Sequence, residues 1–109
     1  MSIDLPPPIS RYFSADKGRD AEVISRCFAD DAIVKDEGRT HSGLAAILQW
    51  KAEASTKYSY TATPIAIAHE GGRTIVTSHL TGDFPGSPVD LRYLFRLEGD
   101  KIAELEIKP

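Results

Sequence analysis

Residues 89–97 alternate between apolar and polar side chains, and this alternation constrains the fold more than any other feature of the sequence. Every second residue from Val89 to Leu97 is apolar, with Tyr93 in the middle, whereas the intervening set includes Asp90 and Arg92. A period of two is typical of a strand that buries one face. We therefore expect a sheet strand in which Tyr93 faces the core, where its hydroxyl needs a hydrogen-bond partner.

The rest of the chain divides into a helical first half and a second half made of strands. Apolar residues at helical spacing predict helices at about Pro7–Asp16, Asp20–Phe28 and Leu44–Ser55. Alternating or apolar segments predict further strands at Ala32–Lys35, Tyr58–Ala68, Thr74–Thr81 and Ile102–Ile107. The Pro64 residue predicts an edge position or a bulge in its strand. This order predicts an α+β fold in which three helices pack on one face of an antiparallel sheet.

Length and composition exclude several classes of protein. The chain has 109 residues, which is room for one domain, and 13 Lys and Arg against 16 Asp and Glu give a net charge of −3. This charge does not favour a nucleic acid or a membrane surface as partner. One cysteine excludes an internal disulfide and a multi-cysteine zinc site. With no apolar run long enough for a membrane span and no leader pattern in Met1–Pro6, we expect a cytoplasmic protein.

Several short segments resemble the nuclear-transport-factor-2-like superfamily, and within it the ketosteroid isomerase and SnoaL-like groups. The run Phe28–Asp36 is nearly identical to one that leads into the first strand of ketosteroid isomerases. The Arg11-Tyr12 pair and the opening Gly43-Leu44-Ala45-Ala46-Ile47 of the third helix also match. The order of helices and strands agrees over essentially the whole chain, which implies one SnoaL-like domain over residues 1–109 with a cystatin-like cone fold.

The resemblance implies roles for particular residues. Asp36 stands where the isomerases carry the carboxylate that shuttles the proton, and Tyr12 stands where they carry a phenol that donates to the oxyanion. Tyr93 replaces a protonated aspartate beside the oxyanion, and it can still donate a hydrogen bond. Phe28 and Lys51 occupy the places of the tyrosines that support the first phenol. Members commonly dimerise through the outer face of the sheet, so the resemblance also implies a homodimer.

The strand expected at Thr74–Thr81 carries a further candidate, His79. The resemblance sets His79 and Thr77 at positions that contact the steroid in the isomerases, and together with Ile75, Trp50 and Leu91 we expect them at the pocket. A pocket histidine can serve as an auxiliary acid or base, since its charge changes near neutral pH. The alternation alone leaves this placement open, because neither face of the strand is cleanly polar. A histidine that is hydrogen-bonded within the core is the alternative.

Other polar residues carry weaker expectations. His41 is expected at the rim of the pocket or in a structural role, and Glu37 is expected to face solvent because it alternates with Asp36. Asp36 itself has an alternative interpretation as a residue that only caps the turn before Gly38. The histidines do not have the spacing of metal ligands, so we expect no metal. The sequence has no Gly-x-Gly-x-x-Gly pattern and no P-loop, so we expect no cofactor.

These observations give two hypotheses from different classes. The first is a small-molecule-pocket protein that catalyses cofactor-independent proton transfer on a small carbonyl compound. Asp36 would be the base, Tyr12 and Tyr93 the oxyanion donors, and His79 an auxiliary group. A carboxylate in an apolar pocket can take a proton from the carbon next to a carbonyl when donors lie close to the oxygen. The second hypothesis is a non-catalytic ligand-binding or dimerisation module.

Overall fold

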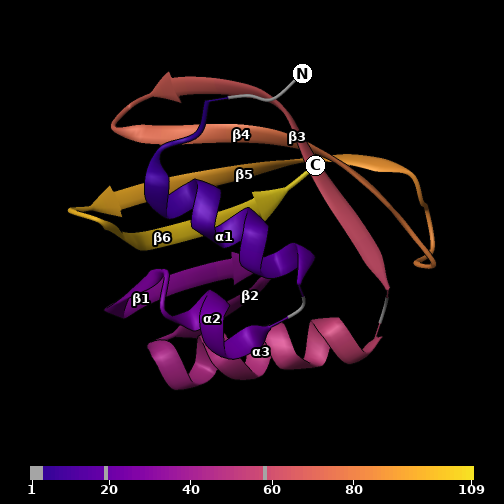
Figure 1. The fold of residues 1–109 in the computed structure, drawn as a ribbon, viewed down its shortest axis with the longest axis horizontal. Coiled ribbons are helices and arrows are strands. Elements are labelled where there is room, and N and C mark those ends of the chain that lie inside the picture. The colour runs from indigo at the N-terminus through magenta and orange to yellow at the C-terminus, as the bar shows by residue number, and fades with distance from the viewer. Residues whose placement is uncertain (1–3, 19, 58) are drawn as a thin grey trace.

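A computed structural model describes residues 4–18, 20–57 and 59–109, which form helices and strands in the order shown in Figure 1. The helices are α1 (Pro7–Lys17), α2 (Ala21–Ser25) and α3 (Leu44–Lys57). The strands are β1 (Phe28–Asp36), β2 (Arg39–Ser42), β3 (Tyr60–Glu70), β4 (Arg73–Gly82), β5 (Val89–Glu98) and β6 (Lys101–Lys108). Tyr58, the expected first residue of β3, lies outside the described residues. Residues 1–3, which belong to the Met1–Pro6 segment in which we find no leader pattern, also lie outside them.

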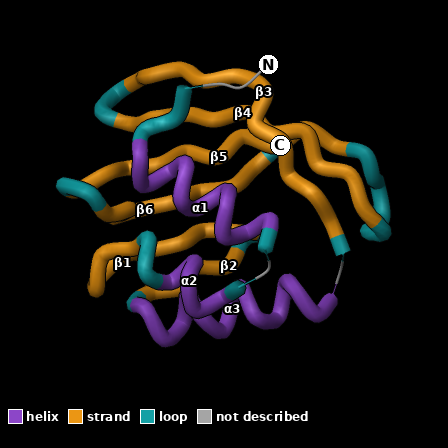
Figure 2. The backbone as a smooth tube through the Cα atoms, in the orientation of Figure 1, coloured by secondary structure: helices purple, strands orange, loops and turns teal. Residues whose placement is uncertain are grey.

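The strands form one sheet in the order β2-β1-β6-β5-β4-β3. Neighbouring strands are antiparallel except β1 and β6, which run parallel, so the sheet is mixed. The sheet is curved, α1 lies across its concave face, and α2 and α3 lie at the end formed by β1 and β2 (Figure 2). The expected α+β fold is therefore confirmed. No helix among the described residues is long and apolar enough to cross a membrane.

Two boundaries differ from the sequence prediction by three residues or more. The second helix ends at Ser25 and not at Phe28, and β1 begins at Phe28 and not at Ala32. The sequence also gave no indication of β2, which pairs with β1 through a tight hairpin. Glu37 and Gly38 both have positive φ angles, 52° and 76°, which is the geometry of a two-residue type I′ turn. This hairpin places Asp36 at the end of β1, opposite Arg39.

The core lies between α1 and the concave face of the sheet. Ile9, Tyr12 and Phe13 of α1 are buried against Tyr93 and Phe95 of β5. The Tyr12 ring packs edge-on against Phe95, with 5.7 Å between the ring centroids. The alternation in β5 thus places Tyr93 inside, as expected from the sequence. Leu94 is also buried, although it points to the opposite face, so the outer face of the sheet has an apolar residue beneath its charges.

The edge strand β3 approaches β4 very closely at its first residue. A Cβ atom at Gly82 would lie 2.8 Å from the Tyr60 Cα atom and would also overlap the carbonyl oxygen of Ser59. Glycine is therefore required at position 82 for the backbone of Tyr60 to take its place. The register of β3 shifts after Pro64, so the expected edge position and the expected bulge both occur.

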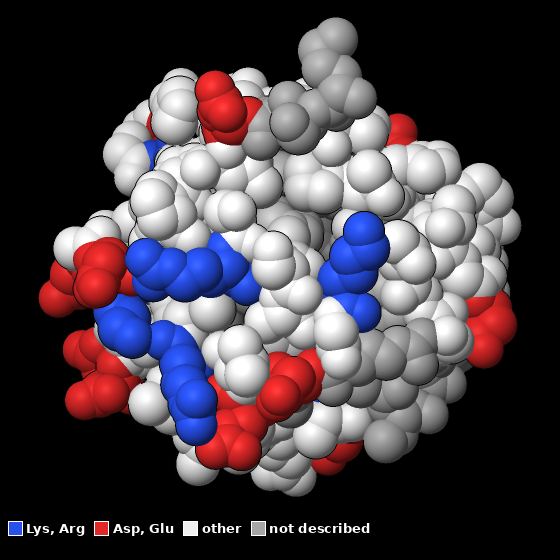
Figure 3. Space-filling view, in the orientation of Figure 1, with Lys and Arg blue, Asp and Glu red and all other residues white. Residues whose placement is uncertain are grey.

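The helical face carries acidic and basic side chains next to one another (Figure 3).

Candidate functional site

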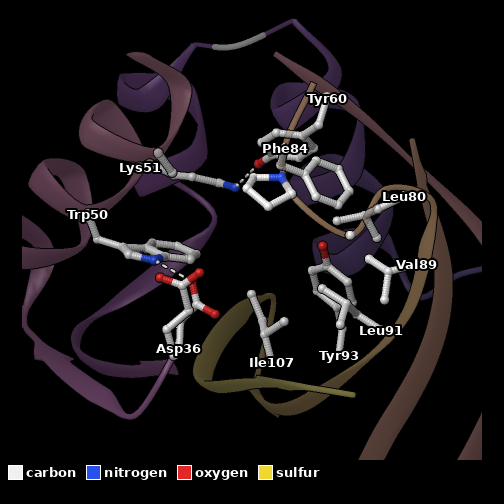
Figure 4. A pocket seen from close by; sticks show the side chains of 14 residues that line it. Asp36, Trp50, Lys51, Tyr60, Leu80, Phe84, Val89, Leu91, Tyr93 and Ile107 are labelled. Carbon is white, nitrogen blue, oxygen red and sulfur yellow. Dashed lines mark hydrogen bonds between the residues drawn. The ribbon is translucent and has the colours of Figure 1, made fainter. Parts of the chain in front are cut away.

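A cavity of about 380 Å³ opens between α3 and the concave face of the sheet. Figure 4 shows polar groups on one side of it and aliphatic side chains on the other. Its lining residues come from six of the strands and helices, from the turn after β1 and from the loop after β4: Asp36, Glu37, Trp50, Lys51, Ala54, Tyr60, Leu80, Phe84, Pro85, Gly86, Val89, Leu91, Tyr93 and Ile107. The cavity is large enough for a small organic molecule.

Asp36 reaches the cavity from the end of β1 and is held by a neighbouring indole. The Trp50 Nε1–H group donates a hydrogen bond to Asp36 Oδ2 at 3.0 Å. Trp50 is 7% exposed, and packing in α3 fixes its ring. A carboxylate with one oxygen held in this way has a defined orientation, and its Oδ1 atom can take a proton from a ligand in the cavity. A turn cap alone would not need this contact.

Tyr93 lies on the opposite wall, where β5 directs it inward. Its side chain is buried, and Figure 4 shows its hydroxyl pointing into the cavity toward Lys51 and Tyr60. Burial, with smaller effects from Tyr60 and Asp16, raises the pKa of Tyr93 well above its ordinary value of 10.0. The phenol therefore stays protonated at neutral pH. A neutral phenol in a largely apolar cavity is a suitable donor to a developing oxyanion.

Tyr12 was expected to face the same pocket as Asp36 and Tyr93, but the structure places it elsewhere. It is completely buried in α1 and does not line the cavity. Its ring centroid lies 6.3 Å from that of Tyr93, so it sits directly behind the cavity wall. Among the described residues, its hydroxyl has no hydrogen-bond partner. Burial, and next the nearby Asp16 carboxylate, raise the pKa of Tyr12 well above 10.0.

His79 does not reach the cavity, which corrects its expected position. The inward residues of β4 are Val76, Ser78 and Leu80, so His79 faces outward and its side chain is 46% exposed. Its Nδ1 atom lies 2.7 Å from Asp90 Oδ1 on the neighbouring strand. The structure thus removes the geometric basis for His79 as an auxiliary acid or base in this pocket.

Two other expected pocket residues share the outward face with His79. Ile75 and Thr77 alternate with the inward set, and neither lines the cavity. Trp50 and Leu91 do line it, as expected. His41 belongs to β2 and packs near Trp50, with 5.9 Å between ring centroids, without lining the cavity. Glu37 is exposed, as expected, but it also forms part of the cavity rim.

The sequence analysis missed a buried polar cluster beside the cavity. Lys51 Nζ lies 2.7 Å from Asp16 Oδ1 and donates to the Tyr60 hydroxyl at 2.8 Å. The Tyr60 hydroxyl in turn donates to Asp16 Oδ1 at 3.0 Å. The side chains of Lys51 and Asp16 are only 3% and 5% exposed. One signal was available, because Lys51 follows Ile47 and Trp50 on the buried face of α3.

In an alkaline titration, the two buried tyrosines Tyr12 and Tyr93 are expected to ionise late. Both folded-state pKa values lie above the 10.0 of the unfolded chain, so folding favours the protonated phenols. Their contribution to stability is complete below pH 10.0 and is lost as the pH rises toward the folded-state pKa. Ultraviolet difference spectra should therefore show these phenols ionising together with unfolding. Tyr12→Phe and Tyr93→Phe should each remove one late-ionising group, and early ionisation of either residue would contradict this expectation.

Among the described residues, no three His, Cys, Asp or Glu side chains gather in a way that could hold a metal ion. The polar groups of the cavity are instead a carboxylate, an ammonium and phenols. Such a set can move protons and stabilise a negatively charged oxygen.

Residues 9–105 match the profile of the SnoaL-like domain family. The chain is a SnoaL-like protein. A candidate polyketide cyclase from Sinorhizobium meliloti is 42% identical to it, with a TM-score of 0.92 over 99% of both chains. This SnoaL-like protein also matches a Catenulispora acidiphila protein with a ketosteroid isomerase-like fold, solved with trimethylamine. That match has 20% identity and a TM-score of 0.84 over 97% of this chain and 87% of the other.

The same fold occurs in an uncharacterized cystatin-fold protein from Novosphingobium aromaticivorans. It is 18% identical, and the match has a TM-score of 0.76 over 94% of this chain and 95% of the other. Among proteins of curated function, none is significantly similar to this SnoaL-like protein. The resemblance is therefore confirmed: the profile shows the SnoaL-like family, and the solved structures show a ketosteroid isomerase-like, cystatin-like fold.

Proposed function

We propose that this SnoaL-like protein binds a small carbonyl compound and catalyses cofactor-independent proton transfer on it, as in isomerisation, cyclisation or dehydration. The observation that carries the proposal is one cavity with the Asp36 carboxylate on one wall and the Tyr93 phenol on the other. The similarity to a candidate polyketide cyclase, at 42% identity, supports the same class of chemistry. A fold of this kind hosts many activities, so the site residues and not the fold carry the argument.

Asp36 is the proposed base. Its carboxylate takes the proton from the carbon next to the ligand carbonyl, and the electron pair of that C–H bond moves to form an enolate. Trp50 holds Oδ2 at 3.0 Å and so directs Oδ1 at the ligand. The protonated carboxyl then returns the proton to carbon or oxygen, which leaves the enzyme unchanged.

Tyr93 is the proposed donor to the enolate oxygen, because its hydroxyl faces the cavity and stays protonated. Tyr12 is proposed as a second donor on a separate ground. Its hydroxyl is buried without a partner among the described residues, and such groups are ordinarily satisfied by a ligand atom or a water molecule. The Tyr12 ring centroid lies 6.3 Å from that of Tyr93, behind the cavity wall, so a bound water molecule would link the Tyr12 hydroxyl to a ligand oxygen that Tyr93 holds.

The test is deuterium exchange at the α carbons of small ketones, diketones and lactones, measured in heavy water by NMR. We expect the wild-type protein to accelerate the exchange of at least one compound, and Asp36→Asn to lose that acceleration. Equal exchange rates for the two proteins would remove Asp36 as the base. Saturable binding of the compounds with no exchange would instead support the alternative, a non-catalytic ligand-binding module.

We also propose that the protein is a homodimer formed through the outer face of the sheet. Ile75 and Leu94 pair on this face, and ion pairs surround them, with Arg73 at 3.0 Å from Glu104. A second copy would cover the apolar pair and extend the ion-pair network. Ile75→Asp is therefore expected to shift the mass measured by sedimentation equilibrium from dimer to monomer. Leu48→Asp, at an exposed leucine of α3, is the control, and a monomeric wild-type protein would refute the proposal.

Residues 1–109 are proposed to act as one SnoaL-like domain in the cytoplasm. The single cysteine, Cys27, is buried and free, which is compatible with a reducing compartment. The family match covers residues 9–105, nearly the whole chain.

A further inference from the structure

The cavity wall contains an ion pair whose burial calls for an explanation. The Lys51 ammonium is 3% exposed, yet it lines the cavity together with Tyr60. Taking two charges out of water is costly, and an apolar pair of similar volume often stabilises a protein at least as well. A contribution to stability therefore does not by itself explain why the Lys51–Asp16 pair is buried. Its position beside the proposed reaction centre suggests a role in ligand binding.

The hydrogen bonds of the cluster leave the ammonium with donor capacity. A lysine ammonium has three N–H donors. One is directed at Asp16 Oδ1 at 2.7 Å and a second at the Tyr60 hydroxyl at 2.8 Å. The third has no acceptor among the described residues apart from aromatic faces such as that of Trp50, whose ring centroid lies 4.8 Å from Nζ. Figure 4 shows the ammonium and the Tyr93 hydroxyl both facing the cavity.

We propose that Lys51 binds an acidic oxygen of the ligand, so that the substrate class is small, planar enols and phenols that bind as their anions. This inference rests on the proposed function, because it uses the same cavity. The third N–H of Lys51 donates to the ligand oxygen, and the Tyr93 hydroxyl donates from the other side. The aliphatic wall of Leu80, Val89 and Leu91 packs on the ring.

The charges that face Lys51 determine where the anion can lie. Asp16 of α1 lies 2.7 Å from the ammonium and neutralises it, but Asp16 does not line the cavity. Asp36 of β1 and Glu37 at the rim are negative and line the cavity. The ligand oxygen is therefore expected between Lys51 and Tyr93, away from Asp36. In the keto form of such an enol, the carbon next to the carbonyl would then lie toward the Asp36 carboxylate, as the proposed proton transfer requires.

The same contacts argue that Lys51 acts as an ammonium donor and not as an amine nucleophile. Attack on a carbonyl requires the neutral amine, with a free electron pair on nitrogen. The Asp16 carboxylate, 2.7 Å from Nζ, stabilises the charged form of Lys51. The Tyr60 hydroxyl accepts a hydrogen bond from the same nitrogen. No covalent intermediate is therefore part of the proposal.

The experiment uses 4-nitrophenol as the probe, because its phenolate absorbs visible light, and 4-nitrotoluene as a neutral probe of similar shape. The key variant is the double substitution Asp16→Leu and Lys51→Met, which removes both charges and leaves the net charge unchanged. We expect it to bind 4-nitrophenolate at least about tenfold more weakly than the wild type, as loss of a charged hydrogen bond implies. Binding of 4-nitrotoluene should change little, which would show that the cavity is intact.

Other variants separate this inference from the proposed function. Lys51→Met alone should also weaken phenolate binding, whereas Lys108→Met, which removes an exposed lysine, should not. Asp36→Asn should bind the phenolate as tightly as the wild type or more tightly, even if catalysis is lost. Equal phenolate affinity in the wild type and the double variant would overturn the inference, as would no binding to the wild type. Borohydride trapping of a small ketone on Lys51 would also overturn it, in favour of a covalent role.

Discussion

Replacing Asp16 with leucine is expected to lower the free energy of unfolding by about 3–5 kcal/mol, because it leaves the Lys51 ammonium buried without its counter-charge. The two groups are 2.7 Å apart and almost completely excluded from water. Tyr60 cannot replace the lost carboxylate, since its hydroxyl supplies only a dipole to the ammonium. Urea denaturation followed by circular dichroism measures the effect, with the slope of the transition checked against that of the wild type.

The matched experiment is to remove both charges at once. The Asp16→Leu and Lys51→Met double variant should recover most of the lost stability, because an apolar pair fills the same space without a desolvation cost. The exposed pair of Arg26 and Glu22 is the control, since its atoms lie 3.0 Å apart and the side chains are 70% and 72% exposed. Arg26→Leu should cost less than about 1 kcal/mol. A double variant as unstable as Asp16→Leu would contradict this account.

The inward residues of β5 show what a single sequence can establish. Alternation placed Tyr93 on the inner face, and the structure buries it there. The same argument failed to place His79, because both faces of β4 mix apolar and hydroxyl side chains. Only the full sheet decides that Val76, Ser78 and Leu80 face the core. Periodicity therefore predicts a site residue only when one face of its strand is clearly apolar.

The hairpin of β1 and β2 was missed for a local reason. Residues 39–42 are polar and only four long, so they carry no alternation that could be detected. Their pairing depends on the positive φ angles of Glu37 and Gly38. From the sequence, Gly38 indicates only a turn after Asp36. The resemblance to ketosteroid isomerases nevertheless indicated Asp36 as a pocket residue, because the match covered its whole strand.

The resemblance placed Lys51 behind Tyr12, but its ion pair was missed, because a sequence does not show which lysines are paired. An isolated lysine on a helix is ordinarily solvent-exposed. Its partners, Asp16 and Tyr60, come from α1 and β3, and the three meet only when both elements pack against α3. Gly82 contributes indirectly, since it allows the backbone of Tyr60 to approach β4. The polar half of the candidate site is thus a product of tertiary packing.

Asp36→Asn is expected to reduce the rate of α-proton exchange by about a hundredfold to ten-thousandfold, the usual contribution of a positioned base. The amide keeps the size of the side chain, and its oxygen can still accept the Trp50 hydrogen bond that is 3.0 Å long in the wild type. Ligand affinity and thermal stability should therefore change little. The effect should appear in kcat and not in KM. A loss confined to KM would assign Asp36 to binding.

The neighbouring carboxylate and the indole provide the controls for this prediction. Glu37 also lines the cavity rim but is exposed and lies in the turn, so Glu37→Gln should leave the exchange rate within about twofold, as expected for a screened surface charge. Trp50→Phe keeps an aromatic ring against the cavity and removes only the donor to Asp36. It should therefore lower kcat, because the Asp36 carboxylate loses the contact that orients it. An unchanged kcat in Trp50→Phe would show that this hydrogen bond does not position the base.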